Sequence, residues 1–164
     1  MQGVIERRYT VTQRRQGMIL FFETSALVKF FHNEEGTDAV TELLNSHENA
    51  IWVLELVRLE FVSALHRRFR NREIDENILN KAIEGFEVEI NRFNMEPLSH
   101  VIVREAEDLL KRYGKEHGLR TLDALHLGCF SLISENDWLF VSTDENLCKV
   151  AEHIGAKVIN PLRK

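Results

Sequence analysis

The sequence predicts an α/β domain in which a parallel sheet lies between two layers of helices. Apolar runs of four to five residues alternate with longer segments whose apolar residues recur every three to four positions. Continuous apolar runs are typical of parallel strands buried on both faces, and the longer period is that of amphipathic helices. Their alternation along one chain favours a sheet of four or five parallel strands joined by helical crossovers.

The first half of the chain supplies two strands and most of the helical length. Thr24 or Ser25 offers the N-cap of the first helix, and Asp75 offers the cap of another. The expected elements, in order, are a strand at residues 18–22, helices at 26–31 and 37–45, a strand at 50–54, a helix at 54–70 and a long helix after Asp75.

The second half completes the sheet. Its expected elements are a brief strand at residues 95–98, a helix capped by Ser99 and stopped near Gly114 or Gly118, a helix at 121–134, a strand at 138–142, a helix at 145–154 closed by Gly155, and a last strand at 156–159. Residues 18–164 are therefore expected to form one domain, preceded by an arm or an extra strand at residues 1–17.

Composition narrows the class of protein. The 164 residues are 44% hydrophobic and 29% charged, which suits a folded core. The net charge of -5 gives no global attraction for nucleic acid, so any such contact needs a local basic patch. No apolar run reaches the roughly 20 residues that span a bilayer, and no signal peptide is expected.

The two cysteines, Cys129 and Cys148, have neither the spacing of a zinc site nor the number of a disulfide framework. Both are expected to behave as small buried hydrophobes in a reducing compartment. A cytoplasmic protein is the expectation that follows.

Four acidic residues stand in apolar surroundings. Glu23 and Asp144 each follow an apolar strand, Glu60 lies on the apolar stripe of its helix, and Asp123 lies in the first turn of its helix. The carboxyl ends of parallel strands are where ligand sites form in open α/β sheets. We therefore expect the four carboxylates to converge at one edge of the sheet.

Each carboxylate also has a purely structural interpretation. Glu23 would be a loop residue, Asp123 a partner of the helix dipole and Asp144 an N-cap. Glu60 would pair with Arg58 or Arg67. Buried together without counter-charge, the four would repel one another, whereas Mg²⁺ or Mn²⁺ would take them as hard oxygen ligands. Their conjunction thus favours a divalent metal site.

The segments around these acids resemble the PIN-domain ribonucleases, most closely the VapC-type toxins of toxin–antitoxin pairs. The resemblance covers about residues 18–161. It lies in Glu-Thr-Ser-Ala-Leu-Val-Lys at 23–29, Arg-Leu-Glu-Phe-Val-Ser-Ala-Leu at 58–65, Arg-Thr-Leu-Asp-Ala-Leu-His-Leu at 120–127, Ser-Thr-Asp-Glu at 142–145 and Gly-Ala-Lys-Val-Ile-Asn-Pro at 155–161.

The resemblance implies a three-layer α/β/α PIN-like domain and a Mg²⁺- or Mn²⁺-dependent endoribonuclease, in which a metal-activated water leaves a 5′-phosphate and a 3′-hydroxyl. Its metal-binding and catalytic acids would be Glu23, Glu60, Asp123 and Asp144. Thr24, Ser25 and Thr143 would orient these acids or bind phosphate. The implied partners are RNA, a cognate antitoxin and a second copy of the chain in a homodimer, with no membrane.

The chain departs from the family pattern at its first acid, where Glu23 stands in place of Asp. The extra methylene displaces the carboxylate, and Mg²⁺ demands near-ideal octahedral geometry. The alternative is therefore a catalytically weak or inactive PIN-fold module that binds RNA or protein. Two other α/β classes are less well supported. A phosphatase of another family would need an Asp-x-Asp pair after the first strand, where this chain has Glu23-Thr-Ser25. A Rossmann domain would need a glycine-rich loop there, and none follows Phe22.

Arginines are the candidate contacts with RNA phosphates or with an acidic antitoxin: Arg67, Arg68, Arg70 and Arg120. The first three could equally be solvated cations near a helix C-terminus. His126 lies three residues after Asp123 and is expected to be packed or hydrogen-bonded near the site.

Overall fold

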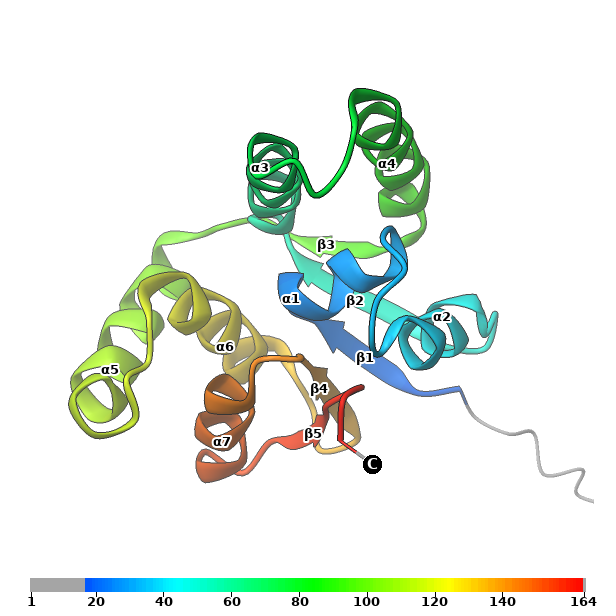
Figure 1. Ribbon diagram of the computed structural model, residues 1–164. Helices are drawn as coiled ribbons and strands as arrows, with labels where there is room; N and C mark the ends of the chain where they lie inside the picture. Colours follow the sequence, from blue (N-terminus) through cyan, green and yellow to red (C-terminus); the bar gives the residue numbers. More distant parts are fainter. Residues whose placement is uncertain (1–16, 164) are drawn as a thin grey trace, which may run out of the picture.

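Figure 1 shows the computed structural model of the chain, which describes residues 17–163. The expected arm at residues 1–17 lies outside the described residues except for Gly17. Within the described part, no helix combines the length and the apolar character that crossing a membrane requires.

The sheet has five strands, all parallel, in the order β3-β2-β1-β4-β5. They are β1 (Ile19–Phe22), β2 (Ala50–Leu54), β3 (Asn94–Glu96), β4 (Trp138–Val141) and β5 (Lys157–Ile159). The chain order reverses between β1 and β4, which pair directly, so the segments that follow these two strands diverge to opposite faces of the sheet. Such a switch point is the usual ligand site of an open parallel sheet.

The helices are α1 (Thr24–Leu27), η1 (Val28–Phe30), α2 (Thr37–Asn45), α3 (Val57–Arg70), α4 (Glu76–Glu89), η2 (Ile90–Arg92), α5 (His100–His117), α6 (Thr121–Ile133) and α7 (Glu145–His153). Apolar residues of α1 to α4 pack on one face of the sheet, and those of α5 to α7 pack on the other. The expected three-layer α/β/α architecture is thereby confirmed.

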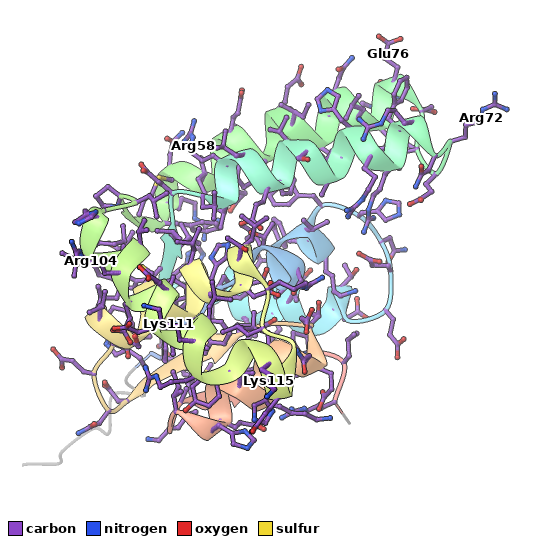
Figure 2. All side chains as sticks on the ribbon, turned by 90° about the vertical axis from the view of Figure 1, so that its left-hand side faces the viewer. Arg58, Arg72, Glu76, Arg104, Lys111 and Lys115 are labelled. Atoms are coloured by element: carbon purple, nitrogen blue, oxygen red, sulfur yellow. The ribbon has the colours of Figure 1, made fainter. Side chains whose placement is uncertain are left out.

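Charged side chains occupy the outward faces of these helices. Arg58 on α3 and Arg104, Lys111 and Lys115 on α5 project into solvent in Figure 2. The two cysteines are buried, as expected, and burial raises the pKa of Cys129 to about 12 and that of Cys148 to about 11. Both therefore remain neutral thiols.

The first helix differs from the expectation in its cap and its length. Thr24 and Ser25 were expected to cap it, but the cap is Glu23, whose carboxylate accepts a hydrogen bond from the Ser25 backbone N–H at 3.0 Å. The expected helix at residues 26–31 is a four-residue α1 that tightens into η1. The side chain of Glu23 is one methylene longer than that of Asp and can fold back onto the start of α1. The pattern of apolar residues in the sequence does not reveal such a cap.

Other boundaries move by small steps. The helix expected to begin at residue 54 begins at Val57, because β2 continues to Leu54. Gly118 ends α5 in the left-handed conformation at φ 62°, so the chain turns directly into α6. At Gly128 an added Cβ would lie 3.1 Å from the Ala106 backbone nitrogen, so the absence of a side chain lets α5 and α6 pack closely.

Candidate active site

A cavity of about 890 Å³ opens where the segments after β1 and β4 meet α3 and α6. Three of the four predicted acids line it: Glu23, Glu60 and Asp123. The predicted Thr24, Ser25, Thr143, Arg67, Arg68 and Arg120 line it as well. Asp144 does not line the cavity but is tied to its rim through Arg120.

Glu23 is only 4% exposed, although it is charged and follows a strand. Its backbone N–H donates to the Val141 carbonyl at 3.0 Å, which extends the pairing of β1 with β4 by one residue. Its Oε1 accepts the Ser25 N–H, and its Oε2 accepts the hydroxyls of Ser25 and Ser142, the latter at 3.0 Å. Both oxygens of this carboxylate are therefore engaged by the protein.

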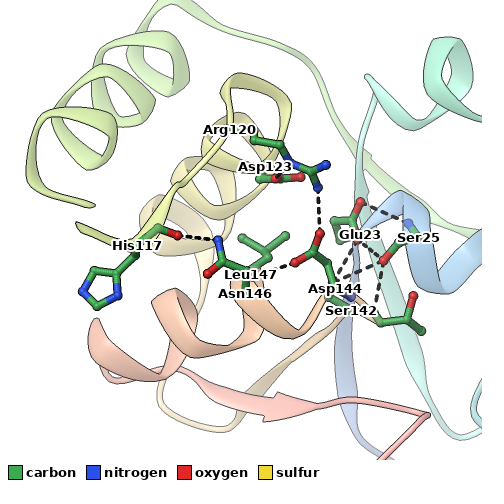
Figure 3. A network of polar contacts seen from close by, with 10 residues as sticks. Glu23, Ser25, His117, Arg120, Asp123, Ser142, Asp144, Asn146 and Leu147 are labelled. Carbon is green, nitrogen blue, oxygen red and sulfur yellow. Dashed lines mark hydrogen bonds and ion pairs between the residues drawn. The ribbon is translucent and has the colours of Figure 1, made fainter. Parts of the chain in front are cut away.

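The two serines link the ends of β1 and β4 into one hydrogen-bonded unit around Glu23, as Figure 3 shows. Ser25 Oγ accepts the Thr143 N–H at 3.1 Å, and Ser142 Oγ accepts the Asp144 N–H at 3.1 Å. Fixing two loops from two strands in this way preorganises the site. Ser142 was not singled out from the sequence, and only its place in the Ser-Thr-Asp-Glu segment pointed to it.

Glu60 reaches the same site from the first turn of α3. Its Oε1 accepts the Thr24 hydroxyl at 3.0 Å and contacts Nε2 of His126, a fully buried residue of α6. Glu60 is a paired acid, as the structural interpretation expected, but its partner is His126 and not Arg58 or Arg67. One oxygen of Glu23, one of Glu60 and a ring nitrogen of His126 lie within 4.8 Å of one another.

Asp123 and Asp144 are joined by one arginine. Arg120 donates from Nε to Asp123 Oδ2 and from Nη2 to Asp144 Oδ2, each at 2.7 Å, and the second contact is drawn in Figure 3. Asp144 also caps α7, because its Oδ1 accepts the Leu147 N–H at 2.9 Å. Asp144 is therefore the expected N-cap and is also linked to Asp123 through Arg120. The Arg120 side chain is 70% exposed, so solvent reaches this ion pair freely.

Burial and nearby charges together shift the pKa values of the site. Burial raises the pKa of Glu23 against the lowering effect of nearby His126 and of the serine hydrogen bonds. It also raises the pKa of Asp123, although Arg120 opposes the shift. For His126, burial disfavours the charged ring, yet the hydrogen bond to Glu60 and the charge of Glu23 leave its pKa raised. The site therefore favours an added positive charge.

The donor set suits a hard divalent cation. Carboxylate oxygens are the ligands that Mg²⁺ and Mn²⁺ prefer. Among the contacts of residues 17–163, Glu60 Oε2 and Asp123 Oδ1 receive no hydrogen bond from the protein, and both residues line the cavity. The residues present thus fit a divalent metal, with Glu60 and Asp123 offering the freest oxygens.

The basic residues divide into two groups. Arg67 and Arg68 line the cavity together with Lys29, which the sequence did not single out. Arg68 and Lys29 both pair with Glu34, at 3.0 and 3.7 Å. The predicted Arg70 lies apart, beside a shallower hollow at the turn between α3 and α4.

The chain is similar to one known protein family and to several solved structures. A family model described as the PIN domain matches residues 20–153. No curated protein matches the sequence. Among solved structures, the FitAcB crystal structure from Neisseria gonorrhoeae is 13% identical with a TM-score of 0.64, and the match covers 88% of this chain and 99% of that one.

Two further structures are similar. VapC20 from Mycobacterium tuberculosis, a sarcin–ricin-loop-cleaving toxin, is 14% identical with a TM-score of 0.65, covering 87% of this chain and 99% of that one. VapBC2 from Rickettsia felis, bound to a promoter DNA fragment, is also 14% identical, with a TM-score of 0.60 and coverage of 87% and 98%. At such identities the likeness concerns the fold.

Proposed function

Because the chain belongs to the PIN domain family, we propose that it is a Mg²⁺- or Mn²⁺-dependent endoribonuclease and the toxin of a toxin–antitoxin pair. One observation carries the proposal: acids from the segment after β1, from α3 and from α6 line a single cavity at the carboxyl edge of the sheet, with arginines at its wall. This is the combination that cleavage of a polyanion requires, because the acids recruit a cation and the arginines attract phosphates.

The acidic residues would have different roles according to their positions in the site. Glu60 and Asp123 would hold the ion through their free oxygens, and Glu23 would join directly or through water. Asp144 would act at the rim once released by Arg120. A bound divalent ion would supply an activated water and neutralise charge on the phosphodiester. The serine-linked loops would keep these acids fixed while RNA enters.

Arg67 is the cavity arginine best placed to receive phosphates, and Arg120 would receive one after leaving Asp123 and Asp144. No described residue forms an ion pair with Arg67, whereas Arg68 is held by Glu34. The net charge of -5 implies that RNA affinity would depend on this wall and not on the whole surface.

The partner proposal rests on the solved structures. Those from Rickettsia felis and from Salmonella typhimurium, the latter 12% identical with a TM-score of 0.59, are VapBC assemblies bound to DNA. By analogy of fold, an antitoxin would bind this chain too. The homodimer that the family resemblance implies is part of the same proposal.

A second function is favoured by one specific observation. Both oxygens of Glu23 are already engaged by Ser25 and Ser142, so the first acid is less available than the other two in the cavity. A PIN-fold protein that binds RNA or a partner with little cleavage would show this arrangement.

The deciding experiment is cleavage of a labelled total RNA pool with Mn²⁺, with Mg²⁺ or with EDTA. We expect metal-dependent cutting by the wild type, reduced by about a hundredfold or more in Asp123→Asn and Glu60→Gln, since small misplacements at a catalytic centre cost that much. Matched controls are Asp108→Asn on α5 and Glu76→Gln on α4, which make the same chemical changes at exposed positions outside the cavity. Glu76 is labelled in Figure 2.

Glu23→Asp separates the two functions. Cutting by this variant but not by the wild type would support the catalytically weak module. Silence of both, with folding verified by circular dichroism, would contradict the nuclease.

A further inference from the structure

We propose that His126 is a positioning residue that holds the Glu60 carboxylate with one oxygen turned to the cavity. The inference deepens the proposed function, because it assigns a residue that sets how one metal-binding acid is presented. It stands on three contacts that join α1, α3 and α6.

The first observation is that two donors converge on a single oxygen. Thr24 Oγ1 donates to Glu60 Oε1 at 3.0 Å, and His126 Nε2 contacts the same atom. A carboxylate accepts hydrogen bonds but cannot donate them, so Nε2 carries the hydrogen of that contact. The Thr24 oxygen and Nε2 are 3.4 Å apart and flank the acceptor from two elements.

The second observation is the freedom of the other oxygen. No described residue donates to Glu60 Oε2, and the Glu60 side chain lines the cavity with 17% of its area exposed. Two donors on Oε1 restrict rotation of the carboxylate, so Oε2 stays directed away from them. A metal ligand held this way loses less conformational entropy on binding.

The third observation is the state of the imidazole ring. His126 is fully buried, and its Nδ1 has no hydrogen-bond partner among the described residues. A buried polar atom without a partner is costly, so a ring present only for packing would be better replaced by an apolar side chain. The contact through Nε2 supplies the reason for a histidine at this position.

The same geometry argues against direct metal binding by His126. Nε2 is occupied by its contact with Glu60, Nδ1 is buried, and the residue does not line the cavity. His126 therefore acts through Glu60, as an outer group that orients a metal-binding carboxylate.

The test uses two amides that imitate the two ring nitrogens. The glutamine amide nitrogen lies three bonds from Cβ, as Nε2 does, whereas the asparagine nitrogen lies two bonds away, as Nδ1 does. The readout is Mn²⁺ affinity by titration calorimetry on the full chain, with thermal unfolding measured in parallel. His47→Asn is the control at an exposed position outside the cavity.

We expect His126→Gln to bind Mn²⁺ within about threefold of the wild type and His126→Asn to bind it roughly tenfold more weakly, the usual range for groups that orient metal ligands. In a Glu60→Gln background, His126→Asn should cause no further loss. A Thr24→Val variant should weaken binding in the same direction, and Thr24→Ser should not.

Three results would overturn the inference. One is a loss in His126→Gln as large as that in His126→Asn, which would indicate direct ligation. Another is unchanged Mn²⁺ affinity in both variants with altered unfolding alone, which would indicate packing. The third is no Mn²⁺ binding by the wild type. Failure to cleave RNA while Mn²⁺ binds would count against the nuclease and leave this inference standing.

Discussion

The acidic site has two halves that are neutralised in different ways. The inner cluster, defined as Glu23, Glu60 and His126, is held by hydroxyl, amide and imidazole groups from within the fold. The outer pair, defined as Asp123 and Asp144, is held by the exposed guanidinium of Arg120. The inner half is built by α1, α3, α6 and the segment after β4, whereas one side chain bridges the outer half.

This difference separates what is rigid from what can exchange. Hydrogen bonds to buried carboxylates are costly to break, because each lost partner leaves a desolvated group behind. An exposed ion pair contributes only about 0.2–1 kcal/mol, since solvent screens it. The inner cluster is therefore built to stay in place, and Arg120 can give way to a metal ion or an RNA phosphate.

The largest expected contrast is in stability. Glu23→Ala removes the cap of α1 and the acceptor of two serine hydroxyls, so we expect a loss of about 2–3 kcal/mol in the free energy of unfolding, even after the cost of burying its charge is relieved. Asp144→Ala should cost about 1 kcal/mol, the worth of an N-cap. Urea unfolding without metal measures both, and equal losses would abolish the distinction between the halves.

A smaller effect is expected on metal affinity. Arg120→Ala removes two ion pairs that compete with a cation, so Mn²⁺ should bind roughly fivefold more tightly, the equivalent of about 1 kcal/mol. Arg163→Ala is the matched control, because Arg163 also joins two acids, Glu145 and Glu152, away from the cavity. Titration calorimetry at low salt would check this, and weaker binding in Arg120→Ala would make Arg120 part of the metal site and not its competitor.

The smallest effect concerns pH. Glu23 and Asp123 have pKa values raised above 4.5 and 3.8, and His126 has a pKa raised above 6.5. In each case the folded state binds the proton more tightly than the unfolded state does. The resulting stabilisation is complete at a pH below the pKa of the unfolded state, and it is lost as the pH rises through the pKa of the folded state. Glu34, Glu107 and Glu145 have pKa values lowered from 4.5, so their titration changes stability only below about pH 4.5. They do not contribute to the pH dependence of stability above that pH.

We therefore expect the metal-free protein to unfold at a lower urea concentration at about pH 8 than at about pH 5.5. His126→Gln should flatten the dependence, because the pKa of His126 is raised above 6.5, and Mn²⁺ should reduce it, because the ion binds the deprotonated site. A stability that rises over this interval would show that groups outside the site control the titration.

The sequence predicted much of the fold because its signals are local. Apolar runs located β1, β2 and β4 to within one residue at each end, the briefer β3 and β5 were placed to within two residues, and the caps Asp75 and Ser99 were found where the structure has them. Strand alternation implied parallel pairing, and Glu23 and Asp144 were expected at one edge because both follow strands. The cap of α1 was missed because glutamate is not a preferred capping residue.

What the sequence determined by itself was the set of acids, the order of the elements and the edge of the sheet where they meet. Only the tertiary structure decided the partner of each acid. Glu23 turns to Ser142, 119 residues away, and Glu60 turns to His126, 66 residues away. The physical reason is that periodicity fixes which face of an element is buried, whereas the direction of a side chain and its counter-charge depend on packing between elements distant in the chain.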